Sequence, residues 1–110
     1  MDLIPRVVRI RRSGGVLLQG CDCYIGRAVK KGGWNLDSSI WANPFKRERG
    51  LPPGSTLPAY EHYVRSNPVL MHKIPLLVGK TLGCWCKPEP CHGDVLVKLV
   101  KEYLLRSGRI

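Results

Sequence analysis

The chain has 110 residues, of which 44% are hydrophobic, so its composition is that of a folded protein and excludes a largely disordered chain. This length suits one hydrophobic core, and we expect residues 1–110 to form a single domain that folds without a metal ion or a disulfide bond. Eighteen Lys and Arg residues against eight Asp and Glu residues give a formal net charge of +10. Because such a surface attracts polyanions, we expect nucleic acid or a phosphorylated small ligand as the partner.

The five cysteines are an odd number, and the basic N-terminal residues contain no apolar run of the signal-peptide type. No window approaches the ~18 apolar residues that a membrane span requires. We therefore expect an intracellular protein of the cytoplasm or nucleus, without a membrane partner. In that reducing environment the thiols stay free for metal binding or for chemistry.

The first half of the chain predicts short strands followed by a long irregular stretch. Residues 7–10 read as a strand with one polar face, residues 13–15 as a turn, and residues 16–18 as the returning arm of a hairpin. A short strand over residues 21–25 ends at Gly26. Residues 28–56 show little periodicity, and a loop of that length in a small domain is usually functional or mobile.

The second half predicts helices on either side of one buried strand. A helix begins near Ser55 or Thr56, and Asn67 is expected to cap a short helix over residues 69–74. A buried strand follows over residues 80–85, and the last helix runs from Cys91 or His92 to residue 106, with an apolar stripe along one side. Strands that alternate with helices in this way indicate an α/β domain.

The segment that joins this strand to the last helix carries the densest group of reactive side chains. On a strand, Cys84 and Cys86 point to the same side because side chains alternate with a period of two. Cys91 and His92 then fall at the N-terminus of the helix, where free amides and the helix dipole favour negative charge and lower the pKa of a thiol. The spacing therefore predicts three thiols and an imidazole around one anion site.

Three interpretations of this segment remain open. In the first, zinc is bound by Cys84, Cys86, Cys91 and His92, although the spacing is not the usual C-x2-C knuckle. In the second, the pocket holds no metal, and the catalytic candidates are Cys86, Cys91 and His92. One thiolate serves as nucleophile or anion ligand, and the imidazole carries a proton. In the third, the cysteines are small buried packing residues. The sequence identifies no cofactor with certainty, and zinc is the one candidate. Whether the protein is an enzyme stays open.

Four motifs of this chain resemble those of the family catalogued as domain of unknown function 4326, which occurs in phages, other viruses, bacteria and some eukaryotes. They are the Val-Val-x-x-Arg pattern at residues 7–11, Tyr-x-Gly-Arg at 24–27, Trp-x-Asn-Pro-Phe at 41–45, and the long cysteine motif at 82–96. The resemblance spans roughly residues 7 to 104 and implies an α/β, Rossmann-like fold with the motifs gathered at one end. Residues 13–20 and 28–38 look like additions to the family pattern, and we interpret Cys21 and Cys23 as packing residues.

Several residues outside the cysteine segment are candidate ligand contacts. The guanidinium of Arg27 suits a phosphate or carboxylate, and Trp41 either stacks on a base or covers the core. The amide of Asn43 either ties its loop or contacts a ligand edge, and Lys46 is placed to hold phosphate. The fifth candidate is Gly93, in the first turn of the last helix. Trp85 and Asp94 are expected to be structural.

These observations favour a pocket that binds or processes a nucleotide, either free or as a unit of nucleic acid. A second hypothesis is a non-catalytic nucleic-acid-binding protein in which zinc or packed thiols brace the last helix. A third is a protein-interaction module, although the sequence names no protein partner.

Overall fold

A three-stranded parallel sheet lies beneath the candidate site and fixes its position. The protein is described here by a computed structural model, which covers residues 3–110. Strands β1 (Arg6–Arg9) and β4 (Cys23–Tyr24) each pair in parallel with β5 (Thr81–Cys84), giving the order β1-β5-β4. Because the strands are parallel, the chain leaves β4 and β5 at the same edge of the sheet.

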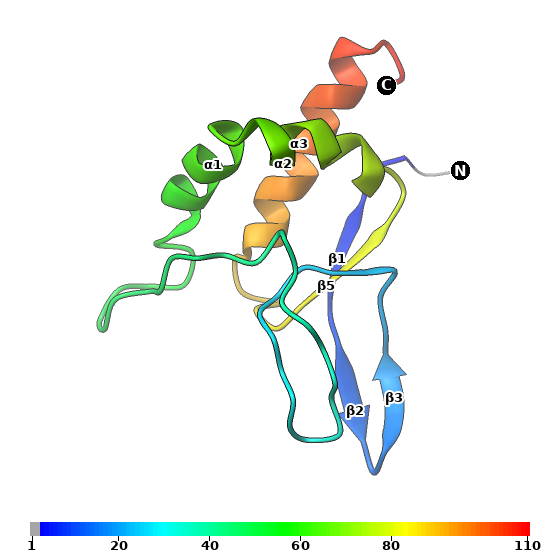
Figure 1. The fold of residues 1–110 in the computed structure, drawn as a ribbon, viewed down its shortest axis with the longest axis vertical. Helices are drawn as coiled ribbons and strands as arrows, with labels where there is room; N and C mark the ends of the chain where they lie inside the picture. The colour runs from blue at the N-terminus through cyan, green and yellow to red at the C-terminus, as the bar shows by residue number, and fades with distance from the viewer. Residues whose placement is uncertain (1–2) are drawn as a thin grey trace.

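The N-terminal hairpin is present, but it is built from residues further along the chain than expected. Its arms are β2 (Arg11–Ser13) and β3 (Val16–Gln19), which pair antiparallel as a separate two-stranded sheet. Residues 7–10, expected to form the first arm, instead belong largely to β1, where they bond to β5. The hairpin projects away from the helices, at the lower end of the molecule in Figure 1.

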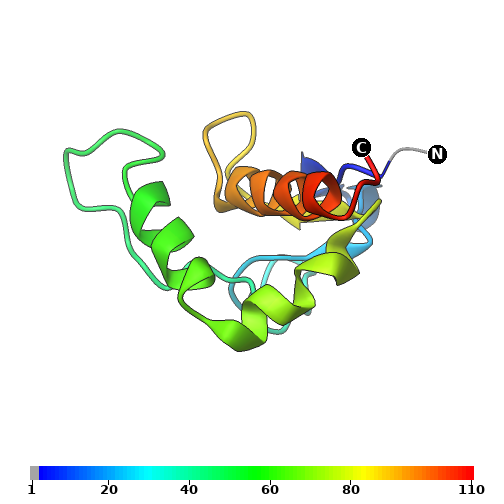
Figure 2. The ribbon, with the colours of Figure 1, turned by 90° about the horizontal axis from the view of Figure 1, so that it is seen from above.

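The helices form where they were predicted, although the hydroxyl of Thr56 does not cap the first of them and instead accepts a hydrogen bond from Asn43. Helix α1 spans Leu57–Arg65, α2 spans Pro68–Lys73, and a short 3-10 helix, η1, continues over Ile74–Leu77. The side chain of Asn67 accepts hydrogen bonds from two free amides of α2, which confirms the predicted cap. Seen from above, the segment from α1 to η1 curves around one side of α3 (Figure 2).

Helix α3 (His92–Arg106) begins with a capping arrangement based on sulfur. The Sγ of Cys91 accepts a hydrogen bond from the amide of Gly93, and the carboxylate of Asp94 accepts one from the amide of Cys91. The predicted start of the last helix is therefore confirmed, and it is fixed by the same cysteine that faces the site.

The core lies between α3, the sheet and the arm formed by α1, α2 and η1. The residues packed there with at most 2% exposure include Tyr60, Val64, Ile74, Leu82, Leu96, Leu99 and Leu104. The hydroxyl of Tyr60 donates a 2.7 Å hydrogen bond to the main-chain oxygen of Trp41, so the long irregular segment is anchored to the core at this point. Burial of these side chains supplies the main stabilising free energy of the fold.

The architecture is a small α/β domain with one parallel and one antiparallel sheet and three α-helices in the described part of the chain. Residues 28–56 contain an isolated bridge between Val29 and Leu36 and otherwise no regular helix or strand. Across residues 3–110, no helix combines the length and the apolar character that crossing a membrane requires.

Candidate functional site

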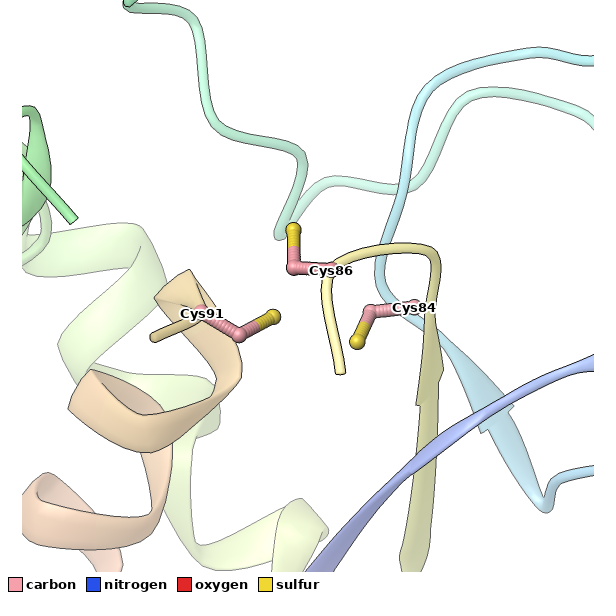
Figure 3. A group of neighbouring side chains, drawn as sticks. All are labelled: Cys84, Cys86 and Cys91. Carbon is pink, nitrogen blue, oxygen red and sulfur yellow. The ribbon is translucent and has the colours of Figure 1, made fainter. Parts of the chain in front are cut away.

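Three cysteine sulfurs converge where β5 meets the start of α3 (Figure 3). Cys84 is the last residue of β5, Cys86 lies in the turn after it, and Cys91 caps α3. The three Sγ atoms all lie within 4.8 Å of one another, and none forms a disulfide bond. We call Cys84, Cys86 and Cys91 the three-thiol group; it can hold a metal ion.

The turn between the strand and the helix is held closed by its own hydrogen bonds. The amide of Glu89 donates to the main-chain oxygen of Cys86, and Lys87 forms an ion pair with Asp94 in the first turn of α3. These two contacts bring residue 86 back toward residue 91. The convergence of the sulfurs therefore follows from the strand end, the turn and the helix cap together.

The thiols are electrostatically coupled. The pKa of Cys84 is lowered, because the thiols of Cys86 and Cys91 donate hydrogen bonds to its sulfur. The pKa of Cys86 and that of Cys91 are raised chiefly through the same contacts with Cys84. Of the three, Cys84 is therefore the sulfur on which a negative charge is most stabilised.

His92 lies beside the three-thiol group but is tied to a different partner. Its Nε2 lies 2.7 Å from the main-chain oxygen of Ile25, and since a carbonyl only accepts, the proton is on Nε2. Its Nδ1 faces the Sγ of Cys91 at 3.7 Å. Burial lowers the pKa of His92, so the ring is neutral at neutral pH. Among the described residues, the three-thiol group includes no nitrogen of His92.

A cavity of about 380 Å³ opens next to the three-thiol group, and Cys86 is the member of the group in its wall. Polar side chains from distant segments line it, among them Arg27, Asn43, Arg47, Thr56, Glu89 and His92. Phe45, Leu57 and Trp85 supply apolar surface. A concave site of this size with a few convergent polar groups is typical of small-ligand pockets.

One wall of the cavity is built by hydrogen bonds between Arg27 and the loop around Asn43. The Nε and Nη2 of Arg27 donate to the main-chain oxygen of Asn43 at 3.1 and 2.8 Å, and Nη2 also reaches the oxygen of Phe45. The Asn43 side chain accepts from the amide of Phe45 and donates to Thr56 Oγ1. Arg27 therefore braces the loop with part of its guanidinium, and the Asn43 amide ties the loop.

The structure brings Arg27, Asn43, Cys86 and His92 together around the cavity and places three other predicted ligand contacts elsewhere. Trp41 is 4% exposed and lies in the core, and Lys46 is exposed but does not line the cavity. Gly93 is buried, and a Cβ there would lie 2.9 Å from side-chain atoms of Ile25 and Val7. The glycine thus lets α3 pack closely against the sheet.

Trp85 is a cavity residue that the sequence analysis assigned to the core. It lies just past the end of β5, is half-buried, and donates from Nε1 to the Tyr24 hydroxyl at 2.7 Å. Its ring also meets Trp34 edge to face at 5.2 Å. The strand ends at Cys84, one residue earlier than predicted, so the alternation of side chains along a strand does not decide which way Trp85 faces.

Arg47, Phe45 and Glu89 also line the cavity and were not predicted. Phe45 adjoins Asn43-Pro44 and Glu89 lies between two prolines of the cysteine turn, so closeness to predicted motifs was the only available signal. Cys21 and Cys23, in contrast, lie outside the three-thiol group, and Cys21 sits where a Cβ on Gly83 would clash with its sulfur.

Comparisons with known proteins find viral relatives and a matching family. "Uncharacterized protein R718" of Acanthamoeba polyphaga mimivirus is 41% identical over 105 residues, covering 88% of this chain and 80% of the relative. "Uncharacterized 12.4 kDa protein in nrdA-td intergenic region" of Enterobacteria phage T4 is 40% identical over 67 residues, covering 58% of this chain and 62% of the relative. No solved structure matches the chain. A family model matches residues 8–102, and the chain therefore belongs to the family described as Domain of unknown function (DUF4326).

Proposed function

We propose that the cavity binds a nucleotide or another small phosphorylated ligand. The observation that carries this proposal is that the cavity lining combines the cations Arg27 and Arg47 with the aromatic ring of Trp85. Cations suit the phosphate and an aromatic face suits the base or another flat ring. The volume, about 380 Å³, lies within the range of small-ligand pockets.

Arg27 suits a phosphate because it is already held in place. Its Nε and Nη2 bond to the loop at Asn43 and Phe45, and its Nη1 has no hydrogen-bond partner among the described residues. Binding an anion at Nη1 then requires little further ordering of the side chain, which favours affinity. The formal charge of +10 adds long-range attraction for the same class of ligand.

Titration calorimetry with adenosine and guanosine monophosphates, with inorganic phosphate as the reference, tests this proposal. We expect a mononucleotide to bind and Arg47→Gln to weaken binding by about 10-fold or more, since a charge-assisted hydrogen bond contributes about 1.5–3 kcal/mol. Arg49→Gln is the matched control, because Arg49 is on the same segment and does not line the cavity.

Two results would count against the pocket. The first is that neither nucleotide nor phosphate binds the folded protein. The second is that Arg47→Gln and Arg49→Gln weaken binding equally, because that pattern indicates general charge attraction and not a defined cavity.

The hairpin supports nucleic-acid binding as a second candidate function. Arg11 and Arg12 lie on β2, one arm of the hairpin, and both are exposed. The hairpin projects from the rest of the molecule (Figure 1). A two-stranded ribbon of this kind fits the major groove of DNA, and arginines supply the phosphate contacts.

Fluorescence anisotropy with a labelled DNA duplex at several salt concentrations tests the hairpin. We expect Arg11→Gln with Arg12→Gln to reduce the salt slope by about 1 per lost phosphate contact. Arg106→Gln with Arg109→Gln, at the other end of the molecule (Figure 1), is the control with the same loss of charge. Equal effects of the two pairs would contradict a hairpin interface.

We further propose zinc as the metal of the three-thiol group, because soft thiolates in tetrahedral geometry favour it. Metal analysis after purification without chelators tests this, with about one zinc per chain expected.

Free thiols of this kind also suit a reducing, intracellular location. The parallel order β1-β5-β4 and a cavity beyond the carboxyl ends of the strands support a Rossmann-like fold.

A further inference from the structure

We propose that a zinc ion held by Cys84, Cys86 and Cys91 keeps its fourth position open to the cavity, where a small anion or an anionic group of the ligand coordinates it. The three-thiol group and the cavity then form one site instead of a structural metal beside a pocket. This inference rests on the proposed function for the cavity and its metal, and it names the part of that site which contacts the ligand.

The sulfur positions suit a three-thiolate ion. Zinc–sulfur bonds of about 2.3 Å in tetrahedral geometry place sulfurs about 3.8 Å apart. The three Sγ atoms are within 4.8 Å of one another, so small side-chain rotations bring them to that spacing. The sulfur of Cys91 is already held by the amide of Gly93, and Figure 3 shows Cys91 and Cys84 approaching each other from the helix and the strand.

The nearest protein donors are engaged elsewhere. The carboxylate of Asp94 uses one oxygen for the amide of Cys91 and the other for Lys87. The His92 ring is anchored by its Nε2 to Ile25, and its Nδ1 does not belong to the three-thiol group. Three protein ligands with a vacant fourth position are the pattern of zinc sites that bind water or substrate, whereas structural sites have four protein ligands.

The exposure of the sulfurs fixes the side on which the fourth position opens. Cys84 and Cys91 are each 1% exposed, whereas Cys86 is exposed and lines the cavity. An incoming ligand therefore reaches the ion past Cys86, from the cavity side. His92 lines the cavity at the same place, so its ring borders the approach.

The local charge also suits an anion at the fourth position. Zinc with three thiolates carries a net charge of −1, which by itself repels an anion. Arg27 and Arg47 line the cavity against one carboxylate, Glu89, and Lys87 is already paired with Asp94. The N-terminus of α3 adds the positive end of its dipole. These charges offset the thiolate excess and draw an anion toward the ion.

Cobalt(II) spectroscopy of the full chain, under reducing and oxygen-free conditions, tests the open position. We expect one cobalt per chain with intense thiolate-to-cobalt absorption, and a shift of the visible d–d bands when azide or inorganic phosphate is added. Cys86→Ser is expected to abolish the thiolate spectrum, whereas Cys23→Ser, a half-buried cysteine outside the group, is the matched control and leaves it unchanged. Circular dichroism verifies that both variants are folded.

His92→Gln separates an open site from a closed one. With an open site, this variant keeps the wild-type cobalt spectrum in the absence of added anion. A wild-type spectrum that responds to neither anion, together with a His92→Gln spectrum that differs from it, means that His92 is the fourth ligand and overturns the inference. Absence of cobalt binding overturns it as well. If the protein binds no nucleotide but its cobalt spectrum shifts with azide, the open metal site is supported and only the proposed nucleotide function fails.

Discussion

His92 at the start of α3 and Ile25 at the end of β4 are joined by a 2.7 Å hydrogen bond from the imidazole Nε2 to the main-chain oxygen. The two residues are 67 positions apart, and the bond links the helix N-terminus to the edge of the sheet. It leaves Nδ1 as an acceptor facing the sulfur of Cys91. The orientation of the ring is therefore set by the fold, independently of any ligand.

His92→Phe is expected to destabilise the fold by about 1–3 kcal/mol, because the buried oxygen of Ile25 loses its partner. Urea unfolding followed by circular dichroism measures the effect. His72→Phe, at an exposed position on α2, is the control and is expected to change stability by less than about 0.5 kcal/mol. Equal stabilities of the two variants would show that the bond to Ile25 has no energetic weight.

Gly93→Ala is expected to destabilise the fold by about 1–3 kcal/mol through overpacking, because the new Cβ would lie 2.9 Å from Ile25 and Val7. Combining it with Val7→Ala removes one of the crowding side chains. A double-mutant cycle is then expected to give a favourable coupling between the two substitutions. Additive effects would mean that α3 has room to shift away from the sheet.

Local signals predicted the parts of the fold that depend on neighbouring residues. The cap of Asn67, the apolar stripe of α3 and the hairpin turn all follow from residues a few positions apart. The positions of Trp41 and Trp85 could not be predicted from such local signals. Whether each ring lies in the core or in the cavity wall is decided by packing against Tyr60 and Tyr24, which are distant in sequence.

The same distinction applies to the site. The spacing of Cys84, Cys86 and Cys91 predicted their convergence, because a strand, a turn and a helix cap are local structures. Arg47 and Glu89 were missed, because no local pattern marks them as facing the cavity. Only the path of residues 28–56 over the domain brings Arg47 to the same cavity as Trp85.

Glu61 is expected to stabilise the protein in a pH-dependent way. The pKa of this carboxyl is lowered by its hydrogen bonds with Arg65 and Lys98. Arg65 lies on the same helix, α1, whereas the bond to Lys98 joins α1 to α3. A lowered pKa means that the contribution is present above the usual value of 4.5 and is lost as the pH falls through the lowered value. Glu61→Gln is therefore expected to lower stability by up to about 1 kcal/mol near neutral pH, and the difference is expected to shrink as the pH falls below 4.5.

The control for this experiment is Glu48→Gln, since Glu48 is exposed and forms no ion pair within the described residues. Thermal unfolding of both variants across the acidic range gives the comparison. A Glu61→Gln effect that stays constant with pH would show that its origin is packing and not charge.

Asn43→Ala is expected to loosen the loop that forms the cavity wall, because it removes the bonds to the Phe45 amide and to Thr56. The loss of one partly buried and one exposed hydrogen bond is expected to cost about 1–2 kcal/mol. Hydrogen exchange should accelerate at the amide of Phe45. Asn35→Ala, which removes an exposed contact with Lys30, is the control and leaves this exchange rate unchanged.

The most direct test of a single site shared by the three thiols and the cavity is a crystal structure of the zinc-loaded protein with inorganic phosphate, measured at the zinc absorption edge. We predict an anomalous peak bounded by Cys84, Cys86 and Cys91, with a fourth ligand that comes from the cavity and not from the protein. A peak coordinated by His92 Nδ1, or no peak at the three sulfurs, would contradict this account.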